Sequence, residues 1–346
     1  MVTVAIVGAG IAGLVCGRSL QAAGHTVFWL EKSRGVGGRL ATRRIEGSGF
    51  VDQGLRYWAP DCAELQTLTT ELIQQGIIHP WMAQGFVWDR EELRPQAGAI
   101  YCSERGINAI AKYLARSCDI RRQHRVTQLV KTASGWQLVA ATSAGDITVS
   151  ADAVVLAIPA PQVLPLLQPL DAQTDGVAVD YRPCLSLMAT YDTLPELPPL
   201  EHLRGWYIAS KHPVLSWLSL DSSKPKQHPG INALLFQSQA DFAAQYFSQL
   251  DAISSDGATA ALQQATVSQM VKAAATIVPG LAAPTDYRLH RWRYSTVRHP
   301  YPKTMLMTKW PSLIGGGDWC SPNSVTNLEA AYRSGLAAAK RLTQQL

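Results

Sequence analysis

Three glycines and one acid near the N-terminus have the types and the spacing of a dinucleotide-binding site. Gly8, Gly10 and Gly13 form a G-x-G-x-x-G pattern, and Glu31 follows Gly8 by 23 residues. In such a pattern the first glycine permits a tight turn, the second lets the backbone approach a pyrophosphate, and the third lets a helix pack against a strand. The acid would accept hydrogen bonds from the adenosine ribose and disfavour a 2′-phosphate, so NADP is not expected here.

The surrounding residues predict the elements that must position this site. Residues 3–7 form a short β-branched apolar run, which is typical of a buried parallel strand, and residues 26–30 form a second one. Residues 14–23 are rich in helix formers and small residues. The N-terminus of this helix, at Ile11 and Ala12, would present free amide N–H groups and a positive dipole end to the phosphates.

A second glycine-rich segment follows the acid directly. Gly37 and Gly38 are adjacent, and Arg39 comes next. Another close backbone approach with a charge partner suits a diphosphate, and a plain NAD dehydrogenase does not need this segment. Residues 31–44, with their G-G-R-x-x-T continuation, resemble the flavin-containing amine oxidase superfamily, and most closely its renalase-like branch. The resemblance implies FAD, held here also by Lys32.

Further segments resemble the same family. Residues 50–58 are similar to its D-x-G-A-Q-Y-aromatic stretch, which passes beside the flavin ring. Two positions depart from the pattern, because Leu55 stands where alanine is usual and Arg56 where glutamine is usual. The resemblance implies that this stretch contacts FAD through four residues: Asp52, Gly54, Leu55 and Arg56.

The resemblance also implies contacts from later parts of the chain. A valine at the position of Val126 holds the adenine through its backbone in the family. Residues 313–318 form a short strand, then glycines, and end at Asp318, which resembles the acid that binds the ribityl chain. Asn327 and Leu328 begin a helix whose N-terminus would point at the flavin N1–C2=O edge. A positive dipole end there favours the reduced flavin.

These elements predict an α/β fold with a Rossmann-type FAD-binding domain of the glutathione-reductase-like, amine oxidase type. A discontinuous substrate domain of mixed sheet plus helices accounts for the remainder. The FAD-binding domain is expected over residues 1–58, 96–160 and 288–346, and the substrate domain over residues 59–95 and 161–287.

Aromatic residues supply the candidates for substrate contact. Flavin oxidation needs little from the protein beyond positioning, and an aromatic wall suits an unprotonated amine or a flat nicotinamide-like ring. Trp292, Tyr57 and Tyr294 are the candidate catalytic residues, although each could equally be a packed core aromatic. Trp292 is favoured because residues 290–294 resemble a renalase-like strand near the ring. Three further aromatic candidates are Trp58, Trp206 and Tyr207.

Non-covalent FAD is expected, because Cys320 falls off the pattern of covalent flavin attachment in the family. Many amine oxidases place a lysine beside flavin N5, and Lys303 and Lys309 lie in a plausible region. Spacing assigns neither of them, and both could be ordinary surface lysines. The six cysteines and eight histidines show no metal-ligand spacing, so no metal is expected.

The composition limits the partners. The chain has 346 residues, 47% of them hydrophobic and only 16% charged, with ten tryptophans. Such a chain either lies against a membrane or buries apolar surface around a large ligand. It has no run of ~20 apolar residues, so no membrane is required. The mild net charge of +5 comes without a basic stripe interleaved with aromatics, so no nucleic acid is expected. Scattered cysteines and the lack of a signal sequence predict a cytoplasmic protein.

The resemblance therefore implies an FAD-dependent oxidoreductase of renalase-like type. It would oxidise a small reduced substrate, either a dihydronicotinamide derived from NAD(P)H or an amine, and pass the electrons to O2. An amine or polyene oxidase or desaturase of the same fold is an alternative. A non-enzymatic binding protein of this fold is disfavoured, because such proteins lose parts of the phosphate cradle. The sequence does not determine the substrate, the electron acceptor or the oligomeric state.

Overall fold

The first sheet has strands in the order β19-β20-β13-β1-β2-β9. Its strands are β1 (Thr3–Val7), β2 (Thr26–Glu31), β9 (Asp119–Arg122), β13 (Ala153–Leu156), β19 (Leu306–Met307) and β20 (Leu313–Gly315). All neighbours are parallel except the β19–β20 pair. Val4 and Ile6 pack into one core and Ala5 and Val7 into another, so β1 is buried on both faces. Two covered faces explain its continuous apolar sequence. The computed structural model describes every residue except 46–48, 61, 97, 99, 172–176, 196–199, 201–202, 226–229, 231, 254, 324 and 346.

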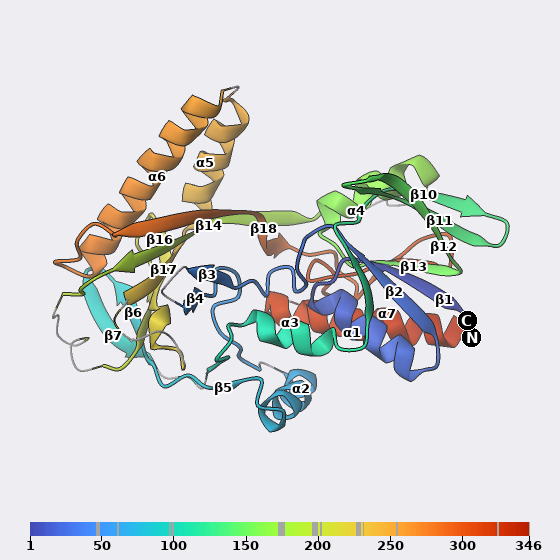
Figure 1. The fold of residues 1–346 in the computed structure, drawn as a ribbon, viewed down its shortest axis with the longest axis horizontal. Helices are drawn as coiled ribbons and strands as arrows, with labels where there is room; N and C mark the ends of the chain where they lie inside the picture. The colour runs from blue at the N-terminus through green and yellow to red at the C-terminus, as the bar shows by residue number, and fades with distance from the viewer. Residues whose placement is uncertain are drawn as a thin grey trace.

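Helices cover one face of this sheet, and a small antiparallel sheet covers the other (Figure 1). The helical layer contains α1 (Ile11–Ala22), α2 (Ala63–Gln74), α3 (Asn108–Leu114) and α7 (Asn327–Gln345). The opposite layer contains β10 (Arg125–Thr132), β11 (Gly135–Thr142), β12 (Gly145–Ala151) and α4 (Ala160–Leu167). The strands predicted at 3–7 and 26–30 are confirmed, and the helix predicted from residues 14–23 spans Ile11–Ala22, with its N-terminus at Ile11 as expected. This Rossmann-type arrangement is the one that the sequence predicts.

The second sheet has the strand order β18-β14-β17-β16-β15-β6-β7. Its strands are β6 (Gln84–Asp89), β7 (Glu92–Gln96), β14 (Asp180–Tyr191), β15 (Trp206–Ser210), β16 (Leu215–Leu220), β17 (Asn232–Ser238) and β18 (Asp286–His299). Helices α5 (Ala240–Asp251) and α6 (Asp256–Ile277) pack on one face (Figure 1). The short pairs are β3 (Arg43–Ile45) with β4 (Gly49–Val51), and β5 (His79–Pro80) with β8 (Tyr101–Cys102).

Side chains of this sheet alternate between two environments. Leu187 and Phe236 belong to the core beneath α5 and α6. Met188 and Leu235, their neighbours in sequence, belong to a separate cluster with Tyr207, Trp217 and residues of the loop after β5. The period of two places successive residues on opposite faces of a strand. The face away from the helices is therefore apolar and rich in aromatic side chains.

The long strands β14 and β18 connect the two halves of the molecule (Figure 1). Residues 288–299 were assigned to the FAD-binding domain by the predicted bounds, but they lie in β18 and hydrogen-bond to the second sheet. The domain bounds themselves stay a prediction. Among the described helices, none is both long enough and apolar enough to cross a membrane.

Candidate functional site

In the first glycine loop, Gly8 and Gly13 are closely packed against the protein, whereas the space beside Gly10 is empty. A Cβ built on Gly8, where φ is +100°, would lie 2.6 Å from the Ala157 carbonyl oxygen. A Cβ on Gly13 would lie 2.1 Å from the Gly8 carbonyl oxygen. A Cβ on Gly10 meets nothing within 4 Å. The fold therefore requires the outer two glycines, while the space beside Gly10 is free for a ligand to approach the backbone.

The second glycine segment lies against the first. Gly37 donates its N–H to the Ala9 carbonyl oxygen at 2.8 Å, and a Cβ on Gly38 would come within 3.6 Å of the Gly10 Cα. The first amides of α1, beginning at Ile11, have no acceptor within the helix. Backbone from two segments and a helix N-terminus thus meet at one place, which fits a diphosphate.

Glu31 is held at the end of β2 and is 7% exposed. Its Oε2 accepts from the Ala9 N–H at 2.9 Å, and its Oε1 accepts from the Ser33 N–H at 2.8 Å. Each carboxylate oxygen keeps a further lone pair that a ribose hydroxyl can use. Lys32 instead lies at the surface and donates to the Gln162 side-chain oxygen at 3.1 Å.

Val126 lies beside the end of β2, as the predicted adenine contact requires. The His124 N–H donates to the Glu31 carbonyl oxygen at 2.9 Å and brings the start of β10 to this edge. The pairing of β10 with β11 shifts between Val126 and Gln128. Such an irregularity frees backbone groups from the ladder, so they can bind elsewhere.

Arg39 and Asp318 pair with each other. The guanidinium donates to both carboxylate oxygens, at 2.6 and 2.7 Å, and also to the Ser295 carbonyl oxygen at 2.9 Å. The Asp318 side chain is 2% exposed, whereas that of Arg39 is 32% exposed. These two residues, predicted separately for the diphosphate and the ribityl chain, thus form one unit that ties the second glycine segment to the C-terminal part of the chain.

Replacing Arg39 tests this unit. In Arg39→Met the buried Asp318 carboxylate loses its partner, and we expect about 3 kcal/mol of destabilisation together with loss of flavin. The matched control is Arg94→Met, because Arg94 pairs with Glu92 on the surface at 67% exposure, where about 0–1 kcal/mol is expected. Urea unfolding and the flavin content of purified protein measure both effects. Equal losses in the two variants would contradict the structural role of Arg39.

Helix α7 begins close to the phosphate cradle, which is formed by the two glycine segments at residues 8–13 and 37–38 and by the start of α1. Thr326 caps it, because its Oγ1 accepts from the Glu329 N–H at 3.3 Å. A Cβ on Gly335, about two turns into the helix, would lie 2.4 Å from the Ala12 carbonyl oxygen, so α7 packs directly on the start of α1. Asn327 accepts through Oδ1 from the Val297 N–H at 3.4 Å. The amides of Asn327 and Leu328 begin the helix and have no acceptor within it.

The segment after β4 is fixed from both sides. Toward the first sheet, the Gly54 N–H donates to the Ala41 carbonyl at 3.2 Å and the Leu55 N–H to the Arg39 carbonyl at 2.8 Å. A Cβ on Gly54 would lie 2.1 Å from that Arg39 oxygen, so only glycine fits.

Three side chains hold the same segment from the second sheet. Trp292 donates its indole N–H to the Gln53 carbonyl at 2.9 Å, and Gln237 donates to the Gly54 carbonyl at 3.0 Å. Lys224 donates to the Arg56 carbonyl at 3.0 Å. Residues 53–56 are therefore clamped between the cofactor side and the sheet. Trp292, the favoured catalytic candidate, acts here by positioning this backbone.

A buried charge network anchors this clamp. Lys224 Nζ lies 2.8 Å from the carboxylates of both Asp52 and Asp221, and all three side chains are fully buried. Asp221 also accepts from the Asp52 N–H at 2.9 Å and from the Ser219 hydroxyl at 2.9 Å. Burial lowers the pKa of Lys224, but the two carboxylates outweigh it, so its pKa is raised and it stays an ammonium.

Sequence reasoning missed Lys224. It considered Lys303 and Lys309, and both of these lie exposed at the surface. Lys224 follows a strand in a polar, loop-like stretch, and no spacing rule links it to Asp52, which lies 172 residues away. The D-x-x-K spacing of Asp221 and Lys224 is its only local signal.

Aromatic side chains form a wall beside the clamp. Tyr207 and Trp217 stack with centroids 4.9 Å apart, and Tyr57 lies 5.5 Å from Trp217. Trp81 completes the group 5.9 Å from Tyr207. The Cζ of Arg56 lies 4.4 Å over the Trp217 ring. Among the aromatic candidates, Tyr57 and Tyr207 belong to this wall, whereas Trp58 and Trp206 pack in cores elsewhere.

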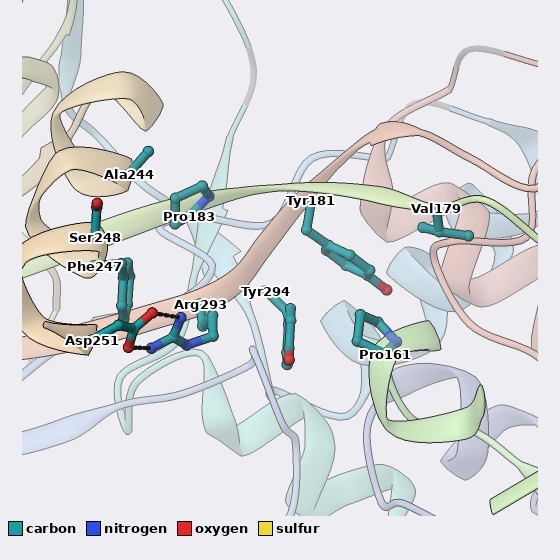
Figure 2. A pocket seen from close by; sticks show the side chains of 10 residues that line it. All are labelled: Pro161, Val179, Tyr181, Pro183, Ala244, Phe247, Ser248, Asp251, Arg293 and Tyr294. Atoms are coloured by element: carbon teal, nitrogen blue, oxygen red, sulfur yellow. Dashed lines mark hydrogen bonds and ion pairs between the residues drawn. The ribbon is translucent and has the colours of Figure 1, made fainter. Parts of the chain in front are cut away.

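Tyr294 lies at a different place from Trp292. The pairing of β14 with β18 shifts between Arg182 and Cys184, and the shift falls opposite Tyr294. The ring of Tyr294 contacts that of Tyr181 edge-on at 5.4 Å. Both tyrosines line an open hollow of about 470 Å³ that reaches α5. Figure 2 shows the residues that line it. The structure therefore does not bring all three catalytic candidates into one wall.

Comparison with known sequences places this geometry in a family. Residues 80–343 match the family described as flavin containing amine oxidoreductase, and residues 6–72 match the NAD(P)-binding Rossmann-like domain. Over 364 aligned residues the chain is 24% identical to renalase from Mus musculus, covering 99% of both chains. A stretch of 69 residues, 20% of this chain and 14% of the relative, is 45% identical to putrescine oxidase from Kocuria rosea.

Solved structures share the fold. A candidate protoporphyrinogen oxidase from Exiguobacterium superposes with a TM-score of 0.72 at 13% identity, covering 99% of both chains. Wild-type putrescine oxidase bound to putrescine gives 0.67 at 14% identity, covering 99% of this chain and 98% of that one. The fold and the glycine cradle define a flavin-dependent oxidoreductase. The chain belongs to the flavin-containing amine oxidoreductase family and is renalase-like along its whole length.

Proposed function

We propose that the chain binds FAD non-covalently and oxidises a small reduced substrate, with O2 as the electron acceptor. Bound FAD would supply the chemistry by accepting a hydride at N5. The observation that carries this proposal is the clamp at residues 53–56, where the phosphate cradle and the aromatic wall meet. The chain's own part is to bind the substrate, to orient it against the ring and to exclude water.

Two observations support non-covalent FAD. The second glycine segment and the Arg39–Asp318 pair extend the cradle beyond what one nucleotide needs. Cys320 is 2% exposed, and burial raises the pKa of its thiol. A buried protonated thiol is a poor nucleophile, so it is unsuited to attachment to the ring. The six cysteines are free thiols, which supports work in the reducing cytoplasm.

The charge of the wall favours a dihydronicotinamide over an amine. Two positive charges 4 Å apart repel by about 4 kcal/mol at an effective dielectric constant of ~20. Arg56 lies against the wall, so an alkylammonium substrate would meet a fixed cation. A neutral flat ring avoids this repulsion and can stack on Tyr57 or Trp217. The same buried charges disfavour a polyene, which requires an apolar channel.

Anaerobic stopped-flow reduction tests the proposed function. We expect the flavin absorbance to be bleached after rapid mixing with isomeric dihydronicotinamides. Mixing with putrescine or benzylamine should leave the absorbance unchanged. Readmitting O2 should restore the yellow colour with one equivalent of H2O2, measured by a peroxidase assay. If only amines bleach the flavin, a dihydronicotinamide is not the substrate. If the flavin is reoxidised without formation of H2O2, O2 is not the direct electron acceptor.

A further inference from the structure

One cation at the candidate substrate site lacks an anionic partner. Among the described residues, no carboxylate lies within ion-pair distance of the Arg56 guanidinium, and it donates no hydrogen bond. Two arginines near the same sheets do have such a partner. Arg39 pairs with Asp318, and Arg293 pairs with Asp251 at 2.7 Å.

The surroundings of Arg56 do not supply the missing charge. Its guanidinium lies over the Trp217 ring, and the titratable groups that act on its pKa are the Tyr57 hydroxyl and the Cys184 thiol on β14. Burial lowers the pKa of Arg56, although an arginine remains cationic in proteins. Both acids of the nearby network, Asp52 and Asp221, are already paired with Lys224. Arg56 is half-buried, and a partly desolvated cation without a partner is unfavourable unless a ligand completes it.

The backbone of Arg56 is fixed in place. Its carbonyl accepts from Lys224, and the segment before it is held by Gln237 and Trp292. The plane of the guanidinium is supported by the Trp217 ring. A planar, positioned guanidinium binds carboxylate and phosphate oxygens through two parallel hydrogen bonds.

We propose that Arg56 is the anion-binding residue of the substrate site, and that the substrate presents a carboxylate or phosphate group to it. This rests on the proposed function only in placing the substrate at the aromatic wall. It makes the site selective for anionic flat rings. It also assigns a role to the arginine that stands where the family usually has glutamine.

A binding experiment tests the proposal without turnover. Nicotinate and nicotinamide have the same ring and differ in charge, and each is titrated into the oxidised holoprotein while the flavin spectrum is followed. We expect nicotinate to bind at least about tenfold more tightly, which corresponds to ~1.4 kcal/mol. Inorganic phosphate, titrated against nicotinate at constant ionic strength, should compete if the natural group is a phosphate. A phosphate that does not compete assigns the site to carboxylates.

Variants locate the effect. Arg56→Gln introduces the glutamine that is usual in the family at this position and removes the positive charge. We expect this variant to bind nicotinate and nicotinamide with affinities that differ by no more than about twofold. The matched control is Arg288→Gln, because Arg288 is 61% exposed and pairs with Asp286. Flavin content and the melting temperature verify that both variants are folded. Equal binding of the two ligands by the unmodified protein, or an unchanged preference in Arg56→Gln, would overturn the proposal.

The two proposals fail differently. If dihydronicotinamides leave the flavin oxidised while nicotinate still binds through Arg56, the proposed function is wrong and the anion site stands. If the flavin is reduced by dihydronicotinamides but nicotinate and nicotinamide bind equally well, the proposed function stands and the anion site is wrong. Tighter binding of benzylamine than of nicotinate would contradict the anion site directly.

Discussion

Replacing Lys224 with methionine should destabilise the protein by about 3–5 kcal/mol, the usual cost of removing one partner of a buried ion pair. The change leaves the carboxylates of Asp52 and Asp221 facing each other without a cation, in a place where neither side chain is exposed. It also frees the Arg56 carbonyl and loosens the clamp at residues 53–56. Urea unfolding followed by tryptophan fluorescence measures the loss, and flavin absorbance measures the effect on the site.

Lys211→Met is the matched control. Lys211 makes an equally short ion pair with Asp89, at 2.7 Å, but its side chain is 68% exposed. Exposed pairs contribute about 0–1 kcal/mol, so this variant should remain close to the unmodified protein. A Lys224→Met variant as stable as Lys211→Met would show that the buried network does not hold the fold together.

The dependence on pH has a definite sign. The pKa of Lys224 is raised in the folded state, so its contribution is fully present below the unfolded value of about 10.4 and is lost only as pH rises through the folded value. The stability lost in Lys224→Met should therefore not decrease from about pH 7 to 9, and a proton bound by the freed Asp52–Asp221 pair in the variant would only increase the loss as pH rises. A difference that falls across this range would mean that Lys224 is not held as an ammonium.

Replacing Gly10 with alanine should weaken flavin binding by about tenfold or more, or at least ~1.4 kcal/mol, while the fold remains intact. The added Cβ meets nothing within 4 Å in the protein, and Gly10 has an ordinary extended backbone with φ of −79°. The methyl group instead occupies the space where a diphosphate would contact the backbone. Fluorescence titration of the apoprotein with FAD measures the loss.

Gly257→Ala serves as its control. A Cβ on Gly257 also meets nothing within 4 Å, and the residue lies in α6, on the outer face of the second sheet. This variant should bind FAD unchanged and be slightly more stable, because alanine is about 1 kcal/mol better than glycine within a helix. If Gly10→Ala binds FAD as tightly as Gly257→Ala, the cradle lies elsewhere.

Local patterns predicted the cofactor half of the molecule well. Gly8 and Gly13 are required by contacts within a strand–turn–helix unit, and such contacts depend on residues near in sequence. Apolar runs predicted β1 and β2 because a strand covered on both faces needs apolar residues at every position. The tryptophan-rich composition favoured burial of apolar surface around a large ligand. Trp217, which was not among the candidates, lies in the aromatic wall, whereas the candidate Trp58 packs in a core.

The substrate side was not predictable in the same way. Trp292 and Tyr294 are two residues apart and would share a face in a regular strand, but the register shift opposite Tyr294 separates them. The pairing of the strands decides which aromatic side chains join the wall and which join the core. It places Tyr207 on the face of the clamp and its neighbour Trp206 on the face covered by the helices. A one-residue change of register would have reversed this choice.

The sequence by itself determined the dinucleotide cradle and the family, because both are written in short-range spacing. Only the tertiary structure decided how charges are partnered: Arg39 meets Asp318 across 279 residues, and Lys224 meets Asp52 across 172. Charges attract each other through space, and burial strengthens this attraction because it lowers the effective dielectric constant. The partner of a charged side chain therefore depends on which segments the two sheets bring together. The same process left the half-buried Arg56 without a carboxylate partner among the described residues, which supports the proposed anionic substrate.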